Sequence, residues 1–188
     1  MVYQANSKLK GIIDGFSKEY KVTADKSREN YMKVLPVGSR VPETGKIYQP
    51  EVEQEFNQRT LQYRAQANEI LDNLLTDVHE KMTKAPTTDA ANTVSLLSSR
   101  SNITRDEIDH LVETYGDNYQ VYRAIQDIAH KSGYRIPDHY LGRQETELGD
   151  LKHNLDTTLR YETAAKHGDS FGAFCSFVET QVDQVVSD

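Results

Sequence analysis

Apolar side chains recur every three or four residues along most of this chain, and this spacing restricts it to helical folds. Steps of three and four residues keep side chains on one face of a helix, whereas a half-buried strand alternates at every second residue. No segment shows sustained alternation. We therefore predict an all-α protein with a long helical hairpin or coiled-coil-like pair plus a compact helical bundle.

Two long helices are predicted in the first half of the chain. One occupies residues 1–35, from about Ser7 to Lys33, and the other occupies residues 51–84. At a rise of about 1.5 Å per residue the second helix is about 50 Å long, which exceeds the width of a small domain. We expect the two helices to pair, within the chain or between subunits. The predicted interface lies on their apolar stripes, at Leu9, Ile13, Phe16, Tyr20 and Tyr31 and at Val52, Phe56, Tyr63, Ile70 and Leu74.

A loop at residues 36–50 separates these helices. Together with Leu35 it reads LPVGSRVPETGKIYQP and holds three of the five prolines. Proline lacks an amide donor and drives the preceding residue towards extended backbone, so no helix continues here. The loop either forms short strand-like pieces or straps itself onto a helix.

Residues 85–188 are expected to form a helical bundle that packs with the long helix as one domain. A short helix over 87–100 begins at Thr87 or Thr88. Thr104 and Glu107 have the spacing of a capping box, with Ile103 as its hydrophobic staple. We place Gly116 after that helix, in the left-handed region.

Three further helices complete the predicted bundle. The first starts at Asp117 or Asn118 and ends at Gly133. A single helix is predicted from about Gly142 to Lys166, and the last helix follows the junction at 167–169.

Charge is divided unevenly along the chain. Residues 1–50 carry a balance of +4 and residues 51–188 a balance of −11, which gives the net charge of −7. Opposite charges of this kind can attract each other within a chain or between neighbours in an assembly. No stretch approaches the roughly 20 apolar residues of a transmembrane helix, and the N-terminus lacks a secretory apolar region. We expect a cytoplasmic protein that forms a homo-oligomer.

The chain offers little catalytic chemistry. Glu107 and His110 have the Glu-x-x-His spacing of di-iron bundles, and the acid–His pairs at 127/130 and 150/153 are related. Such a centre needs two Glu-x-x-His helices, and only one pair here contains Glu. Cys175, the single cysteine, is interpreted as a small buried hydrophobe. We expect no cofactor, no metal and no enzymatic activity, and a metal-dependent helical-bundle enzyme is the third hypothesis.

A DNA-binding regulator is the second hypothesis. The helices predicted at 104–115 and 118–132 could form a helix-turn-helix. The second helix offers polar side chains that could contact DNA, namely Asn118, Gln120, Arg123, Gln126 and Lys131. Residues 100–135 nevertheless hold five basic and six acidic side chains, whereas phosphate contact requires clustered positive charge.

The stretch NITRDEIDHLVETYGDNYQVYRAIQDIAHKSG, preceded by the polar helix around YRAQANEILDNLL, carries a resemblance over residues 50–133. It resembles small helical proteins encoded in the structural gene clusters of phages of Gram-positive bacteria. The shared pattern is T-x-x-E-[IL]-x-x-[LI], then Y-G-D-N-Y and a second helix. The resemblance implies a virion or head-assembly component that acts through contacts with itself or other phage structural proteins. The first hypothesis is therefore a non-enzymatic helical protein–protein interaction protein.

Overall fold

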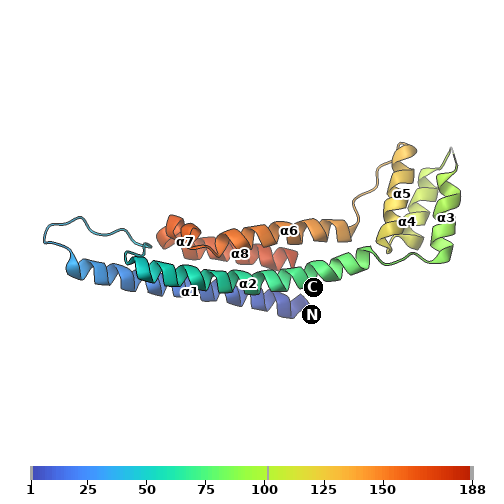
Figure 1. The fold of residues 1–188 in the computed structure, drawn as a ribbon. Coiled ribbons are helices and arrows are strands. Elements are labelled where there is room, and N and C mark those ends of the chain that lie inside the picture. The colour runs from blue at the N-terminus through green and yellow to red at the C-terminus, as the bar shows by residue number, and fades with distance from the viewer. Residues whose placement is uncertain (1, 101, 187–188) are drawn as a thin grey trace. The chain divides into compact units, whose positions relative to one another are not determined.

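The computed structural model describes residues 2–100 and 102–186, and this part of the chain contains helices and no strands (Figure 1). The fold is therefore all-α, as predicted. The elements are α1 (Val2–Val34), α2 (Pro50–Met82), α3 (Thr88–Ser98), α4 (Arg105–Tyr115), α5 (Tyr119–Lys131), α6 (Tyr140–Thr158), α7 (Tyr161–His167), a 3-10 turn η1 (Gly168–Ser170) and α8 (Phe171–Val185).

The chain divides into two compact units, a division that differs from the single domain expected. Unit 1 combines the residues up to Leu74 with those from Leu148 onward, and unit 2 covers Leu75–Glu147. The last two helices therefore pack with α1 and the first part of α2, and not with α3, α4 and α5 as one bundle.

Unit 1 is a bundle of antiparallel helices. α1 lies closest to α8: the Lys10 ammonium is 2.9 Å from the Asp183 carboxylate, and the Tyr20 and Phe171 rings are 5.3 Å apart. The residue numbers rise along one helix as they fall along the other, so the two helices are antiparallel. The long-helix pairing expected from the sequence is thus only part of the packing, because the C-terminal helix is the nearer neighbour of α1.

Large side chains join α1 to α2 in unit 1. The Phe16 and Phe56 rings lie 5.7 Å apart, and Glu19 accepts hydrogen bonds from Arg59 and from the Tyr63 hydroxyl. Burial raises the pKa of the Glu19 carboxyl, but these hydrogen bonds outweigh it and the pKa lies below its usual value. The two helices are therefore held by an aromatic contact and a charged one.

On its other side α2 meets α6. The Arg64 guanidinium lies 2.6 Å from the Asp156 carboxylate, and both side chains are about three-quarters buried. The core of unit 1 lies between these helices and is rich in aromatic rings. Its largest buried side chains are Leu9, Ile13, Phe16, Phe56, Leu71, Leu148, Leu151, Leu155 and Phe171.

The loop between α1 and α2 straps itself onto unit 1, which was one of the two predicted alternatives. Gly45 is buried and has a φ of +72°, and its carbonyl accepts a hydrogen bond from the Tyr20 hydroxyl. The amide of buried Ile47 donates to the Tyr161 hydroxyl at 3.3 Å. A Cβ on Gly45 would lie 2.5 Å from the Cα of Gly168, so the two backbones pack directly against each other.

Unit 2 contains the helices α3, α4 and α5 packed around a small aliphatic core. Its buried members are Ala90, Ile103, Ile108, Leu111, Val121, Ile125, Ile128 and Ala129. The predicted N-caps are confirmed at Thr87 and Asn118, and the capping box of Thr104 and Glu107 is complete. Ile103 is buried beside that box, as expected of a staple.

Two details of the prediction for these helices need correction. Gly116 has φ −66°, so it lies in the right-handed region and not in the left-handed one. The left-handed cap occurs instead at Gly133, with φ +81°, after α5. There the amide of Tyr134 donates to the Ala129 carbonyl at 2.8 Å and that of Gly133 to His130 at 3.1 Å, which is a Schellman motif.

The single helix predicted over 142–166 is wrong, because the chain breaks it between α6 and α7. Arg160 has φ −114° and ψ 143°, which is extended backbone. Side chains satisfy the carbonyls that the break leaves free: Arg160 donates to the Asp156 carbonyl at 3.1 Å and Thr163 to the Thr157 carbonyl at 2.7 Å. The break turns Tyr161 into the aromatic core, where it contacts Phe56.

Candidate interaction surface

The predicted interface residues lie inside unit 1. Five of them are buried (Leu9, Ile13, Phe16, Tyr20 and Phe56), and the other five are partly buried (Tyr31, Val52, Tyr63, Ile70 and Leu74). The Phe16 ring, for example, contacts the rings of Phe56, Tyr63 and Phe171. The chain's own helices fill these stripes, so the five buried residues could not contact another molecule unless the bundle opened.

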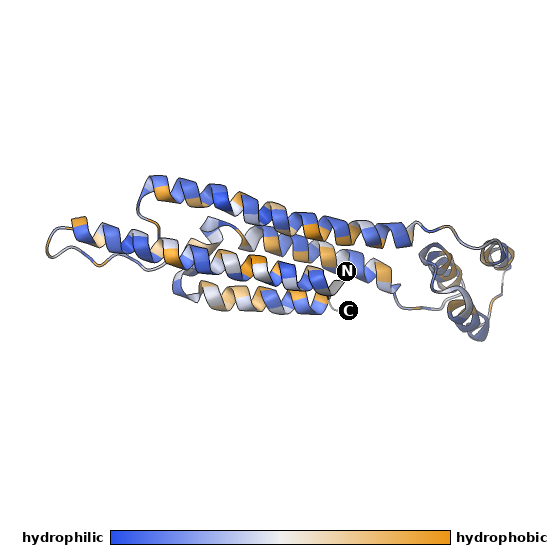
Figure 2. Ribbon diagram, turned by 90° about the horizontal axis from the view of Figure 1, so that it is seen from below, coloured by the Kyte–Doolittle hydropathy of each residue, from blue (hydrophilic) through white to orange (hydrophobic). Residues whose placement is uncertain are grey.

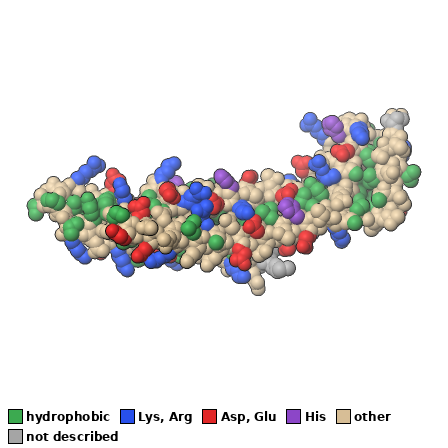
Figure 3. All heavy atoms as spheres, in the orientation of Figure 1, with side chains coloured by type: hydrophobic (Ala, Val, Ile, Leu, Met, Phe, Trp, Pro, Cys, Tyr) green, Lys and Arg blue, Asp and Glu red, His purple; other side chains and the backbone are tan. Residues whose placement is uncertain are grey.

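Exposed apolar side chains gather instead where α1 ends and its loop begins. Val37 is fully exposed, Val34 is 76% exposed, Val41 67% and Met32 45%. We call these four side chains the apolar tip. Hydrophobic side chains appear at this end of unit 1 in Figure 3, and the end of α1 is hydrophobic in Figure 2. A cluster of this kind costs solubility unless a partner covers it.

The tip is exposed because α1 extends past the start of α2. Ser27 marks the level of that start: its hydroxyl accepts from the Tyr48 amide at 2.6 Å, and Gln49 donates to its carbonyl at 3.2 Å. α2 begins at the next residue, Pro50. The residues of α1 after Ser27, about two turns, therefore have no α2 beside them.

A hydrogen-bonded turn and a pair of stacked rings form the backbone setting of the tip. The Ser39 amide donates to the Pro36 carbonyl at 3.2 Å, and Gly38 between them has φ +89°, so Val37 sits in a tight turn. The Tyr31 and Tyr48 rings stack 4.5 Å apart with an angle of 10° between their planes. Val37 is therefore presented on a hydrogen-bonded turn.

Basic side chains outnumber acidic ones around the tip, where the acids of the same stretch are Asp25, Glu29 and Glu43. Within the part of the chain that the structure describes, none of the nearby cations forms an ion pair: Lys26, Arg28, Lys33, Arg40 and Lys46. Their bonds go to neutral groups, as when Arg28 donates to the Pro42 carbonyl at 3.2 Å. The excess of cations over acids around apolar side chains favours an acidic partner.

A groove of about 630 Å³ runs along α1 next to the tip, and like the tip it is lined by both basic and apolar side chains. It is lined by residues of α1 between Gly15 and Asn30 and by Gln49, Val52 and Arg59. Val22, which is 52% exposed, lies between Lys18 and Lys26 on the same helix face. The basic and apolar surface thus extends from the tip along α1.

Three of the five polar side chains offered by the predicted recognition helix bond to other segments of unit 2. Asn118 donates to the Lys84 carbonyl at 2.9 Å, Gln120 to Thr83 at 3.2 Å and Gln126 to Asp138 at 3.0 Å. These groups fix α5 to neighbouring segments of unit 2. Each of these bonds occupies one amide donor that a contact with a DNA base would otherwise use.

The candidate metal residues are not brought together among the described residues, which contain no group of three or more His, Cys, Asp or Glu able to hold a metal ion. Glu107 accepts from the Thr104 amide at 2.9 Å in the capping box, and His110 is exposed. Cys175 is 3% exposed, and burial raises the pKa of its thiol to about 11. The interpretation of Cys175 as a small buried hydrophobe is therefore confirmed.

His139 is a buried polar residue that sequence reasoning missed. The Leu141 amide donates to Nδ1 at 3.1 Å, and Nε2 lies 3.0 Å from the Gly116 carbonyl. A carbonyl only accepts, so the proton is on Nε2 and the ring is neutral. Burial lowers the pKa of His139, against a smaller opposing effect of the Gly116 carbonyl. The imidazole therefore joins the start of α6 to the end of α4 as a structural link.

No protein-family description, no curated protein sequence and no solved structure matches this chain. In its described residues, no helix has the length and apolar content needed to cross a membrane. Fold and surface together define a class: an all-α protein whose larger unit is an antiparallel bundle with a basic, apolar tip.

Proposed function

We propose that this chain is a non-enzymatic helical protein–protein interaction protein and that the apolar tip is its docking site. The observation that carries the proposal is Val37, whose fully exposed side chain sits in a hydrogen-bonded turn among unpaired cations. A flexible loop would pay for ordering when it binds, whereas this turn is already formed.

The size of the tip suits a specific but modest contact. Full burial of an exposed valine contributes about 1.5 kcal/mol, and three valines and a methionine are available. The surrounding cations add electrostatic attraction, which mainly raises the association rate and the selectivity for acidic partners.

The resemblance of residues 50–133 to phage structural-cluster proteins supports a setting in virion or head assembly. In that setting the protein acts by contact with itself or with other structural proteins. No described side chain of unit 2 needs to touch nucleic acid for this role, which separates it from the DNA-binding hypothesis.

Photo-crosslinking tests the docking site. A benzophenone amino acid replaces Val37 in one variant and Leu96 in a control, since Leu96 is also an exposed aliphatic residue, at 70%, but lies on α3 of unit 2. Irradiation of cells that produce each variant should give protein adducts at position 37 and few at position 96. Adducts to lipid or nucleic acid alone, or equal protein adducts at both positions, would refute the proposal.

A further inference from the structure

The outer surface of α2 in unit 1 complements the apolar tip. Its exposed residues between positions 51 and 69 contain three acids and one base, Arg59, which pairs with Glu19 of α1 and lies 4.0 Å from Glu55. The remaining exposed residues recur at helical spacing. They are Glu51, Gln54, Glu55, Gln58, Leu61, Gln62, Ala65, Gln66 and Glu69. We call this set the acidic face. Leu61 lies near its centre and is 58% exposed. Figure 2 shows α2 as predominantly hydrophilic.

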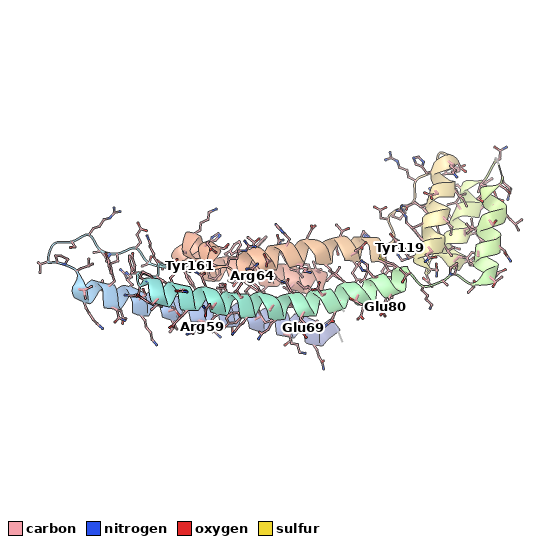
Figure 4. All side chains as sticks on the ribbon, viewed as in Figure 1. Arg59, Arg64, Glu69, Glu80, Tyr119 and Tyr161 are labelled. Carbon is pink, nitrogen blue, oxygen red and sulfur yellow. The ribbon has the colours of Figure 1, made fainter. Side chains whose placement is uncertain are left out.

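The two basic residues of this part of α2 form ion pairs with acids of neighbouring helices. Arg59 pairs with Glu19 of α1, and Arg64 pairs with Asp156 of α6. Both arginines are labelled on α2 in Figure 4. Glu55 lies 4.0 Å from Arg59, which is the longest of the ion-pair distances in unit 1. The acidic face therefore keeps most of its negative charge, with one exposed leucine available for an apolar contact.

We infer that the acidic face of a second copy is a partner of the apolar tip. This inference rests on the proposed function and names the partner. Val37 and Leu61 are both exposed within one copy, so tip and face do not cover each other there. Contact between two tips would bring cations together, and contact between two faces would bring carboxylates together. Only tip against face pairs opposite charges and apolar side chains at once.

Tip-to-face contact is heterologous, because the two copies use different surfaces. Each copy that docks through its tip still presents a free face, and the copy that receives it still presents a free tip. Assembly therefore continues into a ring or an open chain, and does not stop at a dimer. A structural or assembly protein would need this property.

Two variants with one blocked surface each test the inference. The tip variant is V34S/V37S/V41S and the face variant is E55K/L61S, and all five side chains are exposed. Light scattering should show that the wild type grows beyond two chains as its concentration rises. Each variant alone should have the mass of one chain. Their equimolar mixture should form a complex of two chains, because one variant supplies the tip and the other the face.

The control variant L96S should assemble like the wild type, and circular dichroism should show unchanged unfolding midpoints for all variants. Raising the salt from about 0.1 M to about 1 M shortens the Debye length from about 10 Å to about 3 Å and should weaken assembly. A mixture that stays at one chain mass, or a tip variant that still assembles, would overturn the inference.

A wild type that remains a single chain at every soluble concentration would also overturn it. Protein adducts at position 37 would in that case preserve the proposed function, with a different acidic protein as partner. Sedimentation with anionic phosphatidylserine vesicles, together with adducts to lipid alone, would overturn both.

Discussion

Replacing Gly45 with alanine tests whether the loop strap stabilises unit 1. Gly45 has φ +72°, where an alanine costs about 1 kcal/mol. The new Cβ would also lie 2.5 Å from the Gly168 Cα and 2.9 Å from the Tyr20 hydroxyl oxygen. A backbone atom cannot rotate away, so the strap must move and weaken its hydrogen bonds, which are worth about 1 kcal/mol each. We expect a loss of about 2–4 kcal/mol in the free energy of unfolding.

The matched control is G38A in the same loop. Gly38 also has positive φ, at +89°, but a Cβ there meets no atom within 4 Å. G38A should therefore cost only about 1 kcal/mol, the cost of placing an alanine at positive φ. Urea unfolding followed by circular dichroism, with the transitions of the two units fitted separately, measures both losses. If G45A costs no more than G38A, then the backbone contact between residues 45 and 168 does not hold the strap.

Three further predictions concern single side chains. T104A should lower the stability of unit 2 by about 1 kcal/mol in urea unfolding, because it removes the capping box with Glu107, whereas T146A on the exposed surface of α6 should change it little. The folded state favours the neutral form of His139, so the contribution of His139 to stability should be complete above pH 6.5. That contribution should be lost as the pH falls below 6.5 towards the lowered pKa of the folded state. Unfolding midpoints measured against pH should show this loss in the wild type and a smaller one in H139Q. Cys175 should react with a thiol reagent at pH 8 about a hundredfold faster in urea than in buffer, since burial raises its pKa to about 11; equal rates would contradict its burial.

Local structure was predictable wherever neighbouring residues determine it. The side chains of Thr104 and Glu107 each accept a hydrogen bond from the other residue's backbone amide within one turn. Their spacing alone therefore identified the start of α4. The prolines of the loop likewise identified the gap between α1 and α2. These features depend on contacts within about five residues, which a sequence displays directly.

The break between α6 and α7 was not predictable in this way. Residues 158–160 contain neither glycine nor proline, and the apolar spacing continues through them. The break is stabilised by Arg160 and Thr163, which bond free carbonyls, and by the burial of Tyr161 against Phe56. That last contact joins residues more than a hundred positions apart, and periodicity along one helix carries no information about it.

The candidate interface shows the same limit from the other direction. The sequence identified apolar stripes on α1 and α2 but not what covers them. A stripe covered by a partner chain and a stripe covered by the chain's own α8 have the same apolar spacing in the sequence. Because α8 and α7 pack against α1 and Tyr161 of α7 contacts Phe56 of α2, an interface has to be sought where a helix extends beyond its neighbours. On α1 that place follows Ser27, beyond the start of α2, and it coincides with cations that have no acidic partner. The division of charge between residues 1–50 and the rest therefore has a structural counterpart: basic side chains outnumber acidic ones around an uncovered tip, and the exposed acids of α2 form a separate face of the same unit.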